Sequence, residues 1–403
     1  MTDSVVVDLS SVRGTDAGRV GPKMARLGQL AADGWRVPDG YAVTASALDG
    51  WLPAPARAEL ARLFTGPASG PASGAASGPG ELLPLPELAA RAQALVESQP
   101  LPSWLEDAVA AAHARLAARV SARVSARVSA RAGQGDALRV AVRSSAVSED
   151  GHAASFAGQY ETYLGVSGVA DVLLHIRRCW ASGFSAHALS YRRRFGGPAP
   201  VRVHDLAVGV LELVDARSAG VAFTLDPVTG DRGVCVVEGN WGFGESVVSG
   251  HVTPDHWTVD RATGQVRTER VGPKQTWAAY SETAGRVELS PLPADLTGKA
   301  CLTSEEVRHI CERAVAIESA AGGVPQDVEW AVARDLPFPD CVYILQHRPE
   351  TTWTSPLPAR EPRSAEGGAA KGGSAEGGTA EPGKPSFDPV QYALRNVFKV
   401  PGT

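Results

Sequence analysis

The chain has 403 residues, an ordinary globular composition and a formal net charge of −5. This length allows two core-forming domains, taking roughly 100 to 200 residues for each. The small negative charge provides no basic field that would attract nucleic acid or an acidic membrane surface. No apolar run approaches the roughly 18 to 20 residues that span a bilayer, and the first residues lack the basic segment and apolar core of a signal peptide. We therefore expect a cytoplasmic protein that binds neither nucleic acid nor a membrane.

The cysteines are scattered, without a Cys-x-x-Cys pair or a histidine at zinc-ligand spacing. The pattern predicts neither a disulfide framework nor a structural zinc site. We expect the five residues to be buried as small hydrophobic side chains: Cys179, Cys235, Cys301, Cys311 and Cys341.

The N-terminal stretch predicts a helix that begins near Pro22, because proline suits a first helical turn. The apolar residues that follow recur at helical spacing, at Met24, Leu27 and Leu30. Lys23 then lies at the helix N-terminus, where free backbone N–H groups favour an anion. A lysine in such a position is more often simply solvated, so the pattern alone leaves both interpretations open.

Two segments depart from the average composition. Residues 53–80 are rich in Ala, Gly, Ser and Pro, which predicts a low-complexity insertion. Residues 86–132 return to helical periodicity, and the tetrapeptide Ala-Arg-Val-Ser occurs three times in succession from Ala118 to Ser129. A four-residue period places an arginine face beside a valine face. We interpret this region as a solvated helical arm and not as a nucleic-acid surface.

Several further elements follow from apolar runs and turn residues. We predict a helix over 170–193, strands over 206–213, 220–224 and 234–239, a turn at 226–230, and a helix over 303–321 that starts with the capping box Thr303 and Glu306. A strand over 138–146 delivers Arg143, Ser144 and Ser145 into a polar loop. The glycine-bearing turn at 155–162 could bring backbone amides close to a phosphate. Glycines also alternate with bulky residues at 242–250, which by itself is weak evidence for a ligand loop.

The stretch from Asp327 to Arg348 carries the strongest chemical pattern. Two apolar runs flank a turn with two prolines, which predicts an antiparallel hairpin. A period of two places Asp327 and Glu329 on one face of the first strand, and Gln346 and Arg348 on one face of the second. Two carboxylates, an amide and a guanidinium could hold a divalent cation together with a polyphosphate. A surface hairpin with salt bridges explains the same pattern equally well.

Taken together, these blocks resemble the nucleotide-binding domain of the phosphoenolpyruvate synthase, pyruvate phosphate dikinase and rifampin phosphotransferase family, over about residues 18–352. The blocks are Lys23 with residues 27–28, residues 143–146 with 149–150, residues 155–159, residues 220–224 with 226–230, residues 242–245 with 249–250 and 254–255, and the hairpin. The resemblance implies an ATP-grasp fold of the α/β (α+β) class, with the nucleotide in a cleft between two lobes. We expect the lobes at residues 1–205 and 206–353, and a flexible linker with a docking tail at 354–403.

The resemblance also implies roles for individual residues, with ATP and Mg²⁺ as cofactors. The implied catalytic residues are Lys23, Arg143 and Arg348, the first two on the ATP phosphates. The implied metal ligands are Asp327, Glu329 and Gln346. The nucleotide site would further include Ser144, Gly158, Gln159 and Glu245. In the family, a phosphoryl or pyrophosphoryl group passes from ATP to a histidine on a swivelling domain and leaves AMP.

The chain departs from the family pattern at three places. Pro22 stands where the family usually has glycine, and Leu211 stands where a glutamine normally helps to frame the base. No histidine has the Gly-rich Thr/Ser-His setting of the carrier domain, and no phosphoenolpyruvate-binding barrel follows; His187 is a superficial mimic inside the helix predicted over 170–193.

These departures lead to one expectation and two alternatives. We expect an ATP-dependent phosphotransferase subunit whose acceptor histidine lies on a separate partner protein, which passes the group to a small-molecule acceptor. A stand-alone small-molecule kinase is the first alternative, and it would leave ADP instead of AMP. A catalytically inactive nucleotide-binding regulatory protein is the second.

Overall fold

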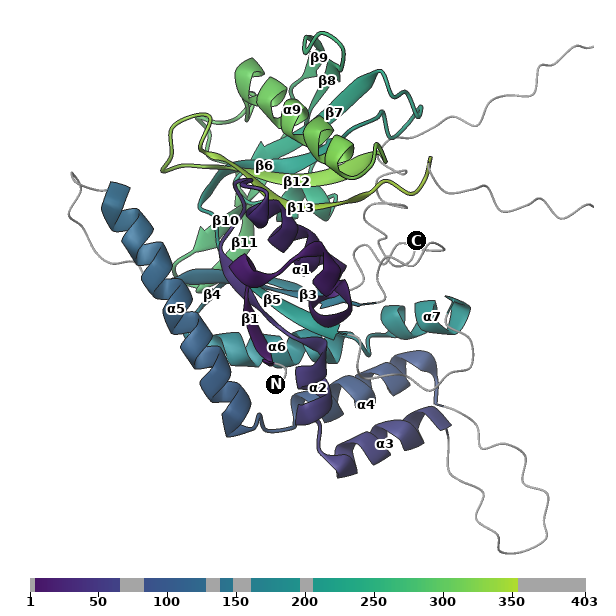
Figure 1. The fold of residues 1–403 in the computed structure, drawn as a ribbon. Coiled ribbons are helices and arrows are strands. Elements are labelled where there is room, and N and C mark those ends of the chain that lie inside the picture. Colours follow the sequence, from purple (N-terminus) through teal and green to yellow (C-terminus); the bar gives the residue numbers. More distant parts are fainter. Residues whose placement is uncertain (1–3, 66–82, 128–137, 148–160, 196–205, 354–403) are drawn as a thin grey trace, which may run out of the picture.

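The computed structural model describes residues 4–65, 83–127, 138–147, 161–195 and 206–353 (Figure 1). Predictions that concern the loop from 148 to 160, including Gly158 and Gln159, and those that concern residues 354–403 lie outside this described part. Within the described ranges, none of the helices combines the length and the apolar character needed to cross a membrane.

The first lobe is built on a five-stranded antiparallel sheet in the order β1-β2-β5-β3-β4. Its strands are β1 (Val6–Asp8), β2 (Gly40–Val43), β5 (Leu206–Glu212), β3 (Arg139–Ala146) and β4 (Thr162–Ser167). The register pairs Arg143 with Gly209 on one side and with Thr162 on the other. Arg143 therefore projects from the middle of the sheet's interior strand β3.

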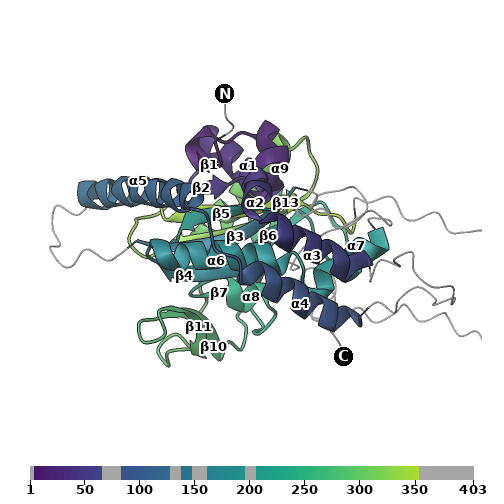
Figure 2. The same ribbon diagram turned by 90° about the horizontal axis from the view of Figure 1, so that it is seen from below.

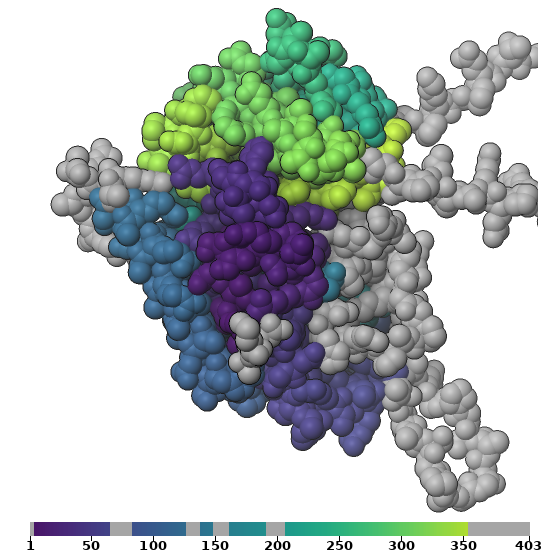
Figure 3. Space-filling model, viewed as in Figure 1, coloured from purple at the N-terminus to yellow at the C-terminus, as the bar shows by residue number. Residues whose placement is uncertain are grey.

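Helices cover both faces of this sheet. One face carries α2 (Ala45–Trp51), α3 (Ala54–Thr65), α4 (Leu85–Glu97), α5 (Ser103–Arg127), α6 (Val169–Ser182) and α7 (Ala186–Phe195). Trp51 of α2 stacks on Trp180 of α6 in that core, with ring centroids 4.9 Å apart. The other face carries α1 (Ala17–Ala32), preceded by the short 3₁₀ turns η1 (Leu9–Ser11) and η2 (Gly14–Asp16). Figure 3 shows these N-terminal residues lying between the two lobes.

The second lobe is a six-stranded antiparallel sheet in the order β13-β12-β6-β7-β8-β9. Its strands are β6 (Ala216–Phe223), β7 (Val234–Trp241), β8 (Asp255–Asp260), β9 (Val266–Arg270), β12 (Gln326–Ala333) and β13 (Val342–Pro349). The helix α9 (Ser304–Ala320) packs on it around the buried Trp257 and Trp330. The short helix α8 (Glu245–Val248) and the hairpin of β10 (Thr276–Ser281) and β11 (Arg286–Pro291) complete the lobe, and Figure 2 shows this hairpin at the edge of the molecule.

Most local predictions are confirmed. The hairpin of β12 and β13 is antiparallel, all five cysteines are buried, and the Thr303–Glu306 capping box forms. The turn at 226–230 is closed by the Asp226 carboxylate, which accepts backbone N–H bonds from Val228 and Thr229. The structure contains two separate larger sheets, of five and six strands.

Four local predictions differ from the structure. Residues 54–65 form α3 and are not part of a low-complexity insertion, because Ala56 and Leu60 are buried against the first core. The helical region 86–132 is two helices, α4 and α5. The helix over 170–193 breaks into α6 and α7 because Ser185 accepts the backbone N–H of Ala188 and caps a new helix. The strands β4, β8, β9, β10 and β11 were not predicted.

The change from the first sheet to the second occurs between Glu212 and Ala216. The predicted lobe boundary after residue 205 falls ahead of β5, which pairs with β2 and β3 in the first sheet. The reason is that β5 and β6 are separated by only three residues, so the sequence offers no linker composition at the true crossover.

Candidate active site

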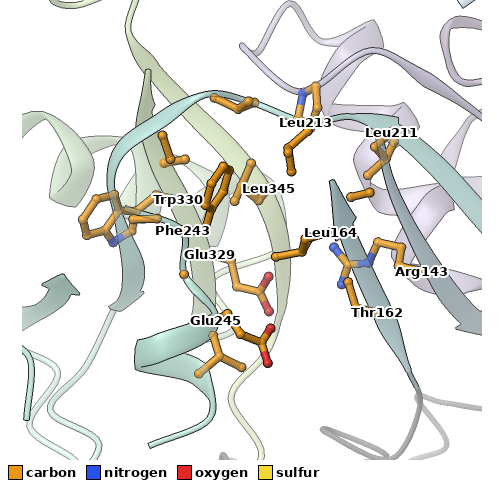
Figure 4. Close-up of a pocket in the computed structure, with 18 of the residues that line it drawn as sticks. Arg143, Thr162, Leu164, Leu211, Leu213, Phe243, Glu245, Glu329, Trp330 and Leu345 are labelled. Carbon is orange, nitrogen blue, oxygen red and sulfur yellow. The ribbon is translucent and has the colours of Figure 1, made fainter. Parts of the chain in front are cut away.

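A solvent-open cleft with about 900 Å³ of empty space lies between the two sheets. One end is apolar, and its residues come from separate segments of both lobes: Pro38, Ala141, Leu164, Leu211, Leu213, Val214, Ala216, Ala219, Phe243, Trp330, Ala331 and Leu345. The other end is charged and carries Arg143, Glu245 and Glu329 (Figure 4). The cleft thus suits a ligand with a flat apolar part and a charged part.

The hairpin register sets two polar residues opposite two others. Asp327 pairs directly with Arg348, and Glu329 pairs directly with Gln346. This confirms the period-two prediction, since each pair lies on one face of its strand. A β-bulge follows at Glu329 and Trp330 and shifts the register beyond that point.

Asp327 and Arg348 form a buried ion pair. The Asp327 Oδ2 atom accepts Nε of Arg348 at 2.7 Å and lies 2.6 Å from its Nη2, while Asp327 is only 6% exposed. Burial raises the pKa of Asp327, and the Arg348 charge opposes that rise. The surface salt-bridge interpretation of the hairpin is therefore wrong for this pair. The Asp327 carboxylate orients Arg348 through Oδ2, while its Oδ1 atom is buried and has no hydrogen-bond partner among the described residues.

Arg143 and Gln346 connect the two lobes. The Arg143 Nη2 group donates a hydrogen bond to Oε1 of Gln346, so the amide oxygen predicted as a metal ligand already has a donor. The Arg143 Nε atom is buried and has no hydrogen-bond partner among the described residues. A buried unpaired donor on a guanidinium in a cleft is available to an anionic ligand.

Two carboxylates face one another at the charged end. Figure 4 shows the side chains of Glu245, from the first turn of α8, and Glu329, from β12, converging opposite Arg143. Burial raises the pKa of Glu245, and the negative charges of Glu329 and Glu161 raise it further, while His251 opposes this. Facing carboxylates in a partly buried cleft favour a divalent cation, because a cation relieves their repulsion.

The residues present fit a magnesium ion as a partial ligand set. Glu329 and Gln346 are directly opposite in register, and both present oxygen atoms, which Mg²⁺ prefers. Within the described residues, no group of three or more His, Cys, Asp or Glu side chains is placed to hold a metal. The remaining ligands of such an ion would thus come from water and phosphate oxygens, as is usual for Mg²⁺.

Lys23 lies just after a kink in α1. Gly21 has φ 75°, and a side chain there would meet the Ser145 carbonyl oxygen at 2.2 Å, so the turn packs directly on β3. The Met24 N–H donates to the Ser145 hydroxyl at 3.3 Å. A new helical segment therefore begins near Pro22, as predicted.

The Cys179 thiol and Ser144 are both buried in the first lobe. Burial raises the pKa of this thiol, and the positive charges of Arg143 and Lys23 both counteract the rise. Ser144, also predicted for the site, is buried in β3, where its N–H donates to the Glu161 carbonyl at 3.4 Å.

Leu211 is explained by packing. Its side chain belongs to the small core beneath α1, together with Val20, Met24 and Leu27, and is 3% exposed. The position also borders the cleft, where leucine adds apolar surface in place of an amide. The leucine is thus explained by packing beneath α1 and by the apolar lining of the cleft.

Sequence reasoning missed the apolar end of the cleft and the acidic Glu161. The lining residues come from at least six separate segments, so no periodic pattern marks them. The one available signal was the run of glycines around Phe243, which the structure places in the cleft wall.

Comparison with known proteins agrees with this geometry. Residues 17–367 match the family described as the pyruvate phosphate dikinase AMP/ATP-binding domain, which has an ATP-grasp type of fold. A probable phosphoenolpyruvate synthase of Staphylothermus marinus is 35% identical over 368 residues, which cover 87% of this chain and 41% of that protein. A rifampicin phosphotransferase of Streptomyces is 35% identical over 363 residues, covering 90% of this chain and 37% of that protein. A prodigiosin synthesizing transferase of Serratia marcescens is 32% identical over 357 residues, which cover 89% of this chain and 34% of that protein.

The chain spans less than half the length of each of these relatives. The family match, in contrast, covers most of the chain and includes both sheets and the cleft between them. The protein belongs to the pyruvate phosphate dikinase AMP/ATP-binding domain family.

Proposed function

We propose that this chain binds Mg·ATP in the cleft and transfers a phosphoryl or pyrophosphoryl group to a histidine on a separate protein, which passes the group to a small-molecule substrate. The observation that carries the proposal is the polarity of the cleft. Arg143, linked to Gln346, faces the Glu245 and Glu329 carboxylates at one end, and the other end is apolar.

The apolar end suits the adenine ring. Leucine and phenylalanine side chains from both lobes can cover its two faces, and the backbone between β5 and β6 runs along its edge. The N–H of Val214 in that backbone makes no hydrogen bond within the described part of the chain. It is available to an acceptor nitrogen of the base.

The charged end suits the phosphates. Phosphoryl transfer needs positioning and neutralisation of the charge that spreads over the transferred group. Arg143 and Lys23 supply positive charge, and Arg348 is fixed in orientation by Asp327. A magnesium ion held by Glu329 and Gln346, with Glu245 beside it, would neutralise the phosphate oxygens when bound.

Two observations support an acceptor outside the cleft. No histidine is among the cleft-lining residues that the structure describes. The relatives named phosphoenolpyruvate synthase and rifampicin phosphotransferase are much longer than this chain, and that extra length can hold a carrier histidine.

The test is product analysis with purified full-length chain and a co-encoded candidate partner. We expect AMP from Mg·ATP only when the partner is present, together with acid-labile label on the partner from radioactive ATP. The Glu329→Gln variant should lose this activity, whereas Glu288→Gln, on the exposed edge hairpin, should keep it. Formation of ADP with a small molecule and no partner would instead establish direct transfer, and tight binding with no turnover would establish a regulatory protein.

A further inference from the structure

The arginines of α5 are partly exposed and also pair with acidic side chains of the first lobe. The side chains of Arg115, Arg119 and Arg123 are 50%, 37% and 30% exposed. Arg115 donates to Asp8 at 3.2 Å, Arg119 donates to both carboxylate oxygens of Asp39 at 2.8 and 3.1 Å, and Arg123 donates to Glu212. Figures 1 and 3 show α5 running along one flank of the molecule from the helices below the first sheet toward the region between the lobes.

The last two of these arginines hold residues that adjoin the apolar end of the cleft. Glu212 and Pro38, the neighbour of Asp39, both line the cleft. Asp39 and Glu212 are tied to each other by two hydrogen bonds: the Asp39 N–H donates to Glu212 Oε1 at 3.0 Å, and the Glu212 N–H donates to the Asp39 carbonyl at 2.7 Å. The Glu212 side chain is 8% exposed, so Arg123 pairs with it from the outside of a largely buried contact.

The backbone that follows Glu212 is held at two further points. The Leu213 N–H donates to the Arg139 carbonyl at 2.9 Å, and the Arg334 N–H donates to the Asp215 carbonyl at 3.0 Å. Between these points lies Val214, whose N–H points to no partner among the described residues. Glu212, on the N-terminal side of this segment, is thus one of three points that fix the position of the Val214 N–H.

We propose that Arg123, supported by Arg119, is a positioning residue for the nucleotide base, acting through Glu212 on the segment from Glu212 to Val214. The inference rests on the proposed function, because it assigns the apolar end to the base. It also assigns a purpose to the Ala-Arg-Val-Ser repeat, whose four-residue spacing puts Arg119 and Arg123 on the same helix face. Contacts that hold the base strengthen the binding of ATP, but they do not affect a ligand that consists of phosphates alone.

The experiment compares ligands that do and do not contain a base. Calorimetry on the full-length chain measures the dissociation constants of Mg·ATP, adenosine and Mg·tripolyphosphate. In Arg123→Gln we expect ATP and adenosine to bind roughly tenfold more weakly, because one buried charge-assisted hydrogen bond is lost, with tripolyphosphate unchanged. Glu212→Gln keeps the acceptor for the Asp39 N–H but removes the charge, and it should reproduce the effect.

Matched variants separate positioning from folding. Arg115→Gln changes the same helix face about two turns before Arg123 but leaves Glu212 and Asp39 untouched, so it should bind all three ligands normally. Arg123→Lys should recover part of the loss, because lysine keeps the charge without the planar fork. Thermal unfolding of each variant checks that the fold is retained.

Two results overturn the inference: normal ATP binding by Arg123→Gln, or equal weakening of ATP and tripolyphosphate, which would indicate general destabilisation. A wild-type chain that binds no Mg·ATP would overturn the proposed function itself, and the inference with it.

Discussion

Arg143 of the first sheet donates a hydrogen bond to Gln346 of the second sheet, although the two residues are 203 positions apart in the sequence. The bond joins the lobes beside Glu329, which lies directly opposite Gln346 in the hairpin. A ligand phosphate that recruits Arg143 would act on this contact between the lobes. From the proposed function we therefore expect nucleotide binding and lobe arrangement to be linked through this guanidinium.

Replacement of Arg143 tests this link. Arg143→Lys should lower partner-dependent turnover by about 10²-fold, because preorganised donors of this kind typically contribute 10² to 10³ and lysine lacks the second donor arm. Steady-state kinetics provides the measurement. Arg286→Lys, on the exposed β11 strand, is the control and should turn over normally. Wild-type rates for Arg143→Lys would remove Arg143 from the phosphate end.

Removal of one facing carboxylate should change the magnesium requirement. Glu329→Gln is expected to raise the Mg²⁺ concentration for half-maximal ATP binding by at least about tenfold, because a charged oxygen ligand is lost. Glu245→Gln should have a smaller effect. Because the pKa of Glu245 is raised, protonation should weaken Mg²⁺ binding at a higher pH than for an ordinary glutamate, and Glu245→Gln should flatten that dependence. An unchanged requirement in both variants would place the ion elsewhere.

The buried pair of Lys274 and Asp255 should be important for stability. Both side chains are 0% exposed, and the Asp255 carboxylate also accepts the backbone N–H groups of Gly272 and Cys301 at 2.8 Å each. Lys274→Met leaves an unpaired buried carboxylate, so we expect the free energy of unfolding to fall by about 3 to 5 kcal/mol. Denaturant unfolding measures the change.

The contrast is the exposed pair of Arg267 and Asp260. Arg267→Met should lower the free energy of unfolding far less than Lys274→Met does, since an exposed ion pair gains little in water. Comparable losses in the two variants would show that burial of the Lys274 pair is not the decisive factor.

His347 should make stability depend on pH. Burial lowers its pKa to about 4, helped by the positive charge of Arg26, whereas an unfolded histidine titrates near 6.5. Between these values the unfolded chain binds more protons, so the contribution of His347 is complete above pH 6.5 and is lost as the pH falls to 4. The loss should approach about 3.5 kcal/mol, since the two pKa values differ by roughly 2.5 units at about 1.4 kcal/mol per unit.

Unfolding curves at pH 7.0, 5.5 and 4.5 for wild type and His347→Gln provide the measurement. The pKa values of His113, His175 and His309 are also lowered by burial, so they contribute a pH dependence in the same direction. The difference between the two proteins isolates His347. If the stability difference between the two proteins were the same at all three pH values, His347 would have the same pKa in the folded and unfolded chain, which would contradict the prediction.

Local chemistry determined much of this protein from the sequence alone. Alternation placed Asp327 with Glu329 and Gln346 with Arg348 on common faces, because a strand has a strict period of two. The Thr303 cap and the Asp226 turn followed from hydrogen bonds within a few residues. The family resemblance over these blocks then implied the ATP-grasp fold, which the comparisons confirm.

Only the tertiary structure decided how these blocks meet. Contacts such as Arg143 with Gln346, and Arg123 with Glu212, join residues that no local rule connects. Burial also added partners that the sequence did not indicate: Asp327 pairs with Arg348, and the α5 arginines pair with acidic residues. The physical reason is that side-chain partners across sheets depend on which surfaces the chain buries together, whereas strands, caps and turns depend on neighbours along the chain.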